Sequence, residues 1–119
     1  MEASVVGPSN MAVIVGKRME MKCQVDGGLI VREWSFQRTL TLNRKTLYTN
    51  WKNRSSIINA HFGVDVDEFG SGKLYVNSTT LDDAGIYICL MGLRQVTMQP
   101  HQYRAHLIVF GTFSSSQFL

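Results

Sequence analysis

The sequence predicts an all-β domain built as a sandwich of two antiparallel sheets. The chain has 119 residues, 45% of them hydrophobic, which is enough apolar material for one sizeable core. Apolar and polar residues alternate with period two in several short segments, and turn-forming residues separate these segments. Helical periodicity is absent over any long window. Many short strands with turns between them are typical of a two-sheet sandwich.

The clearest strand is expected at Met19–Val25, where apolar residues alternate with Glu20, Lys22 and Gln24. Asp26-Gly27-Gly28 is the turn that ends this strand. Further strands are expected at residues 34–37, 46–51, 73–77, 86–91 and 103–110, with turns at residues 43–45 and 70–72.

Residues 1–110 are expected to form the domain. Residues 111–119, with Ser114-Ser115-Ser116, are expected to form a stalk or linker. The sequence shows neither a signal peptide nor an apolar stretch long enough for a membrane helix. If the protein is secreted or anchored in a membrane, we expect those segments to lie outside this chain.

The two cysteines, Cys23 and Cys89, suggest one disulfide and an oxidising compartment. The alternative is a pair of buried free thiols in a cytosolic protein. Two glycosylation sequons, which begin at Asn53 and Asn77, shift the balance slightly toward a secreted protein. We therefore expect an extracellular location, at the cell surface or secreted.

A short motif indicates the family. Residues 83–89 read Asp-Ala-Gly-Ile-Tyr-Ile-Cys and fit Asp-x-Gly-x-Tyr-x-Cys, and Trp34 follows Cys23 by 11 residues. Over about residues 5–110 the chain resembles immunoglobulin-superfamily domains. The resemblance implies that Cys23 and Cys89 join the two sheets and that Trp34 packs on the bridge. It also implies a tyrosine corner at Tyr87 and fold roles for the motif residues Asp83 and Gly85.

The long interval from Trp34 to Lys73 leaves room for the C′ and C″ strands, so the resemblance is to V-type domains. His61 stands where such domains usually carry an arginine that pairs with Asp83. Residues 110–113, Phe-Gly-Thr-Phe, match only half of the joining motif of antigen receptors, and they follow the last good strand. The chain is thus similar to adhesion and recognition receptors such as junctional adhesion molecules and the coxsackie–adenovirus receptor. An ancestral antigen-receptor-like V domain is the alternative.

No catalytic pattern is visible. The sequence lacks a Gly-x-Ser-x-Gly elbow, a P-loop and a dinucleotide fingerprint. His101 and His106 are five residues apart on a strand and point to opposite faces, so they are not expected to share a metal. We expect no enzyme, metal or cofactor. The net charge of +3 is too small to indicate nucleic acid.

Binding is expected on the outer face of the sheet that holds strands G, F, C and C′. Large aliphatic residues out of phase with Cys89 lie there among polar ones, as in protein interfaces. The alternative is scattered surface hydrophobics. We expect a homodimer, or pairing with a related V domain. The predicted partner-binding residues are Ser35, Gln37, Tyr48, Ile88, Leu90, Arg104, His106 and Ile108.

The loops at one end of the domain are a second candidate surface, for an immune-type receptor that binds a ligand or pathogen glycan. The candidate residues are Leu93, Arg94, Gln95, Val96 and Met98. Residues 34–64 contain no Asp or Glu, and their cations form a basic stripe that could meet an acidic glycan. These cations are Arg38, Arg44, Lys45, Lys52 and Arg54.

Overall fold

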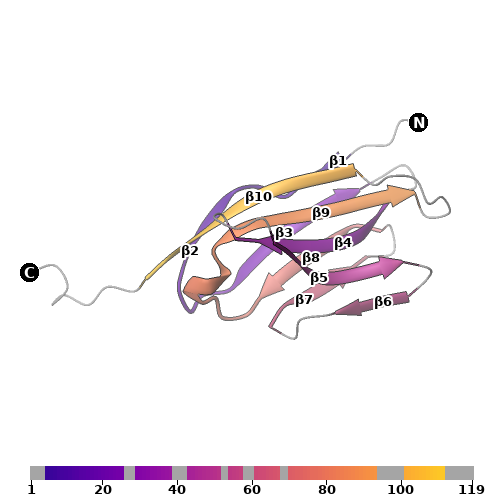
Figure 1. The fold of residues 1–119 in the computed structure, drawn as a ribbon. Helices are drawn as coiled ribbons and strands as arrows, with labels where there is room; N and C mark the ends of the chain where they lie inside the picture. The colour runs from indigo at the N-terminus through magenta and orange to yellow at the C-terminus, as the bar shows by residue number, and fades with distance from the viewer. Residues whose placement is uncertain are drawn as a thin grey trace, which may run out of the picture.

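The computed structural model is a sandwich of two β-sheets (Figure 1). It describes residues 5–25, 29–38, 43–51, 54–57, 61–67, 70–93 and 101–111. The elements, in chain order, are β1 Val5–Val6, β2 Met11–Ile14, β3 Met19–Val25, β4 Leu29–Gln37, β5 Arg44–Trp51, β6 Arg54–Ile57, β7 Gly63–Val66, β8 Gly72–Val76, the short 3-10 helix η1 Leu81–Asp83, β9 Gly85–Leu93 and β10 His101–Phe110.

One sheet has four strands in the order β1-β3-β8-β7, and all its pairings are antiparallel. The other has six strands in the order β2-β10-β9-β4-β5-β6. Its pairs are antiparallel except for β2 and β10, which run parallel. In immunoglobulin nomenclature the smaller sheet holds strands A, B, E and D. The larger sheet holds A′, G, F, C, C′ and C″, so both extra strands of a V-type domain are present.

The disulfide joins the sheets at the centre of the core. Cys23 on β3 is bonded to Cys89 on β9, and both cysteines are fully buried. Trp34 on β4 lies directly opposite Cys89 in the strand register and is also fully buried. The bridge and the indole belong to one buried cluster, to which both sheets contribute. The predicted disulfide is confirmed.

Two β-bulges bring extra side chains into the core, because a bulge breaks the strict alternation of a strand. On β4, Val31 pairs with Met91 and Glu33 with Leu90, so Arg32 is the extra residue. Val31 and Trp34 are three positions apart and would point to opposite faces of a regular strand. With the bulge between them, both are fully buried in the core.

The turn from η1 into β9 is the tyrosine corner. The Tyr87 hydroxyl donates to the backbone oxygen of Asp83 at 2.6 Å, and burial raises the pKa of this phenol well above its usual range. The Asp83 carboxylate accepts from the backbone N–H of Thr80 at 2.7 Å, which caps η1. At Gly85 a Cβ atom would lie 2.7 Å from the Phe36 ring and 2.8 Å from the Gln37 carbonyl oxygen. The motif glycine is therefore needed for close packing on β4.

The strands expected from the sequence all occur, with ends shifted by a few residues. β4 begins at Leu29, well before Trp34, and β9 extends to Leu93. β10 ends at Phe110, which is the first residue of the partial joining motif. Residues 112–119, most of the expected tail, lie outside the described residues, as does the turn at 26–28. Among the described residues there is no helix long and apolar enough to cross a membrane.

Candidate recognition surface

The outer face of the larger sheet presents three cross-strand rows over β10, β9, β4 and β5. The rows follow from the strand register, in which directly opposed residues point to the same face. They are Gln102–Leu90–Glu33–Thr49, Arg104–Ile88–Ser35–Thr46 and His106–Ile86–Gln37–Arg44. Apolar residues thus occupy β9 in the middle of the face, and polar residues occupy the strands on both sides.

Two residues expected at this surface are buried within the domain itself. Ile88 and Ser35 both have 0% of their area exposed. Ile88 lies between Arg104 and Ser35 in the register, and the Ser35 hydroxyl donates to Glu33 Oε2 at 2.8 Å. Side chains on the neighbouring strands cover the middle of the face, as long amphipathic side chains often do. The prediction that Ile88 and Ser35 are surface contacts is therefore wrong for the isolated domain.

Tyr48 is a third correction. It belongs to the core cluster and is 4% exposed. Trp34 pairs with Tyr48 and Ser35 with Thr46, so Leu47 is the extra residue of a second bulge. The consecutive residues Leu47 and Tyr48 are both buried in the core cluster as a result. Strict alternation placed Tyr48 on the outer face because it does not take the bulge into account.

The other five predicted residues do reach the surface. Arg104, His106 and Ile108 are exposed on β10, whereas Leu90 and Gln37 are partly buried. Arg104 donates from Nε and Nη2 to the Gln102 amide oxygen, at 2.8 Å each. These residues lie on one side of the sheet and combine polar side chains with a partly exposed leucine and an exposed isoleucine.

The exposed large hydrophobic residues of this face lie at its edge, over β2 and β10. We call it the A′–G patch and define it as Ala12, Ile14, Ile108 and Phe110. The register pairs Ile108 with Ala12 and Phe110 with Ile14, and all four residues are exposed. The exposed fractions are 48% for Ile14, 55% for Ile108 and 50% for Phe110. The patch therefore supplies half of the six large hydrophobic residues exposed in the described part of the chain.

Sequence reasoning missed Ile14 and Phe110 in this patch. The alternation along β10 could have identified Phe110, because Ile108 and Phe110 point away from the core whereas Leu107 and Val109 point toward it. The pairing of β2 with β10 brings Ile14 beside Phe110. No pattern within a single short segment of the sequence predicts this pairing.

The end loops fall largely outside the described residues. Arg94, Gln95, Val96 and Met98 lie there, as do the sequon residue Asn53 and the basic residue Lys52; of Leu93 only the backbone is described. In the basic stripe, Arg44 and Lys45 are exposed, and Arg38 pairs with Asp82 at 3.1 Å across two exposed side chains. Such a surface pair contributes little stability and partly neutralises the stripe.

The expected contact between His61 and Asp83 is present. His61 Nε2 lies 2.9 Å from Asp83 Oδ2, and the imidazole is 38% exposed beside a carboxylate that is 7% exposed. The histidine therefore occupies the place of the usual arginine.

Replacing His61 with Arg is expected to stabilise the domain at pH 8. An arginine stays charged there, whereas most histidines are neutral. The gain should be about 0.3–1 kcal/mol, because the pair is partly exposed. Urea unfolding of both proteins at pH 8 measures it. His101→Arg adds the same charge at an exposed site and is the control; equal gains for the two variants would contradict the assignment.

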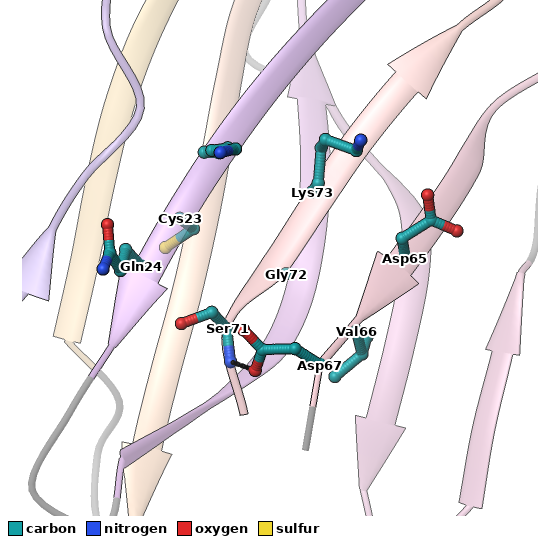
Figure 2. A pocket seen from close by; sticks show the side chains of 9 residues that line it. Cys23, Gln24, Asp65, Val66, Asp67, Ser71, Gly72 and Lys73 are labelled. Atoms are coloured by element: carbon teal, nitrogen blue, oxygen red, sulfur yellow. Dashed lines mark hydrogen bonds between the residues drawn. The ribbon is translucent and has the colours of Figure 1, made fainter. Parts of the chain in front are cut away.

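A hollow of about 350 Å³ lies on the outer side of the smaller sheet (Figure 2). Two lysines and two aspartates of its lining, Lys22, Lys73, Asp65 and Asp67, balance in charge. Asp67 Oδ1 already accepts the Ser71 backbone N–H at 2.9 Å. Within the described ranges no three His, Cys, Asp or Glu side chains are grouped to hold a metal ion. Because its positive and negative side chains balance, the lining of the hollow does not favour a ligand of either charge.

Two sheets, the buried Cys23–Cys89 bridge, Trp34 beside it, the tyrosine corner and strands C′ and C″ define an immunoglobulin fold of the V type. No protein-family model matches the sequence, and no curated protein matches it.

Solved structures do match in fold. A chain in the structure on T cell specificity and activation by the bacterial superantigen toxic shock syndrome toxin-1 aligns with a TM-score of 0.73 and 19% identity, over 92% of this chain and 100% of that one. Murine CRIg aligns with a TM-score of 0.71 and 15% identity, over 92% and 98%. The complex of Dpr1 IG1 with DIP-eta IG1 contributes a chain with a TM-score of 0.63 and 18% identity, over 91% and 95%. At these identities the likeness establishes the fold.

Proposed function

We propose that this domain is an extracellular recognition or adhesion module and not an enzyme. It binds a protein partner, a second V-type domain, through the outer face of its larger sheet. The observation that carries the proposal is the A′–G patch, which continues on the same face into Leu90, Arg104 and His106. One of the similar chains comes from a complex of two IG1 domains, Dpr1 IG1 bound to DIP-eta IG1.

The chemistry of the face favours a protein partner. The A′–G patch contains no charged side chain, so a second copy would meet no like charge at its centre. Arg104, His106 and Arg44 lie beyond it with Glu33 as a counter-charge, and they supply the polar rim of a protein interface. We therefore take a second copy of this chain as the first partner to test.

The expected affinity is weak to moderate. Burial of Ile14, Ile108 and Phe110 contributes about 1.5–3 kcal/mol for each side chain that becomes fully buried, and less for these half-exposed ones. Association costs about 4–15 kcal/mol in lost rigid-body freedom. The balance suits surface receptors, which gain strength from many copies.

Ile108→Arg is expected to yield a folded monomer, because it places a charge in the centre of the patch. Equilibrium sedimentation of the wild-type domain and the variant is the measurement. The wild type should dimerise at micromolar to high micromolar concentration, and Ile108→Arg should weaken the dimer at least tenfold. Leu90→Arg should weaken the dimer as well. Ile88 is buried, so Ile88→Arg would report on folding and not on dimerisation.

Val66→Arg is the matched control. Val66 is 42% exposed on β7, in the other sheet, so the same change there should leave the dimer intact. A wild-type chain that stays monomeric at high micromolar concentration, and binds no related V domain, would contradict the proposal. Binding on a glycan array, lost on changes at residues 94–98, would instead favour an immune-type receptor that uses its end loops.

A further inference from the structure

The second sequon has a defined setting at the end of β8. Asn77 follows Val76, the last residue of the strand, and is exposed. Along β8, Gly72, Leu74 and Val76 are buried, so Asn77 continues the outward-facing series of Lys73 and Tyr75. Asn77 and Tyr75 are thus on one side of the chain, about 6–7 Å apart along it.

Arg18 binds the side chain of Asn77 through one atom. The Nη1 group of Arg18 donates to Asn77 Oδ1. A guanidinium has donors only, so the atom that it contacts must be the amide oxygen. The other amide atom, Nδ2, is therefore not the one that Arg18 holds. Nδ2 is the atom to which an N-linked sugar is joined.

Tyr75 forms a fixed platform beside Asn77. Its ring lies over Gly63, where a Cβ atom would be 2.1 Å from the ring, so only glycine allows this placement. The Arg18 guanidinium carbon lies over the ring, 4.4 Å from its centroid, and Arg18 Nε also donates to Glu20 at 2.8 Å. A sugar at Asn77 would meet a planar, pre-ordered surface with donors at its rim.

We propose that Asn77 carries an N-linked glycan whose first sugar packs on the Arg18–Tyr75 stack. In the reaction, Nδ2 attacks the anomeric carbon of an oligosaccharide linked to a lipid pyrophosphate. The new C–N bond replaces the bond from that carbon to the pyrophosphate oxygen, the lipid pyrophosphate leaves, and the amide gives up a proton to a base. Thr79 is 1% exposed, and its hydroxyl donates to the Lys17 carbonyl oxygen at 2.9 Å. The sequon is therefore recognised before the domain folds.

The glycan leaves the proposed recognition face open. Asn77 lies at the same end of the sandwich as the A′–G patch, because the Thr79 hydroxyl also contacts the Ile14 carbonyl oxygen at 3.3 Å. Asn77 nevertheless belongs to the outer side of the smaller sheet, and the patch belongs to the outer side of the larger one. The glycan proposal rests on the extracellular location in the proposed function but not on the recognition face, so the glycan and the interface can fail separately.

The test uses the full chain with a secretion leader, made in eukaryotic cells with Asn53→Gln to remove the other sequon. Intact mass is measured before and after an endoglycosidase that leaves one sugar. Most of the secreted protein should carry a glycan, and Asn77→Gln should abolish it. Secreted, folded protein with an unmodified Asn77 would overturn the modification.

The packing of the sugar is tested by melting temperature. The one-sugar form should melt higher than the same chain made with its disulfide in a bacterial periplasm, where no sugar is added. Tyr75→Thr should remove this increment, even though the variant itself is less stable. An equal increment with and without the Tyr75 ring, or no increment in the parent, would overturn the packing.

Discussion

Replacing Trp34 with Ala is expected to lower the free energy of unfolding by about 3–5 kcal/mol, as for other large core truncations. Trp34 is fully buried beside the Cys23–Cys89 bridge, between the two sheets. Removal of the indole leaves a cavity against a covalent crosslink, and the walls of such a cavity have little freedom to close. Urea unfolding of the purified domain measures the loss.

Trp34→Phe is the matched control. It retains an aromatic ring, and the Nε1 group of Trp34 has no hydrogen-bond partner among the described groups, so no bond is lost with it. We expect this variant to lose less than half as much stability as Trp34→Ala. A loss below about 1 kcal/mol for Trp34→Ala would contradict the placement of Trp34 in the core.

The double change Cys23→Ala with Cys89→Ala is expected to cost roughly 4 kcal/mol. The two cysteines are 66 residues apart, and in the chain-entropy model a crosslink over such a loop restricts the unfolded chain by that amount. A domain of this size has a total stability of about 5–15 kcal/mol, so the variant should be partly unfolded at body temperature. Thermal unfolding of the variant beside the oxidised wild type is the measurement.

Reduction of the disulfide in the wild-type domain under mild denaturant is the control, because it removes the crosslink without introducing alanine side chains. It should produce a similar loss, because it breaks the same bond and leaves both thiols in place. If the reduced protein keeps its stability while the double variant loses it, the loss comes from packing and the crosslink has little effect.

The fold was predictable because its signals are local. Alternation in Met19–Val25, the spacing from Cys23 to Trp34, and the motif that places Tyr87 two residues before Cys89 each lie within a short segment and have a stated physical reason. The His61–Asp83 contact could be inferred in the same way, since one residue stands in the place of another with a known partner. These features do not depend on fine details of strand register.

The candidate site was predicted less well because it depends on register. One extra residue, Leu47, turns Tyr48 toward the core, and no local pattern distinguishes such a bulge from a regular strand. Ile88 faces outward as expected, but its exposure depends on side chains of two other strands. The A′–G patch depends on a parallel pairing between residues almost a hundred positions apart.

The central claim is that a partner binds on the outer face of the larger sheet. Amide NMR spectra of the labelled domain, recorded from low to high micromolar concentration, test the location directly. We expect shifts or line broadening in β2, β10 and the part of β9 near Leu90, with β3, β7 and β8 unchanged. Changes confined to the end loops at residues 94–100, or to the smaller sheet, would contradict the account.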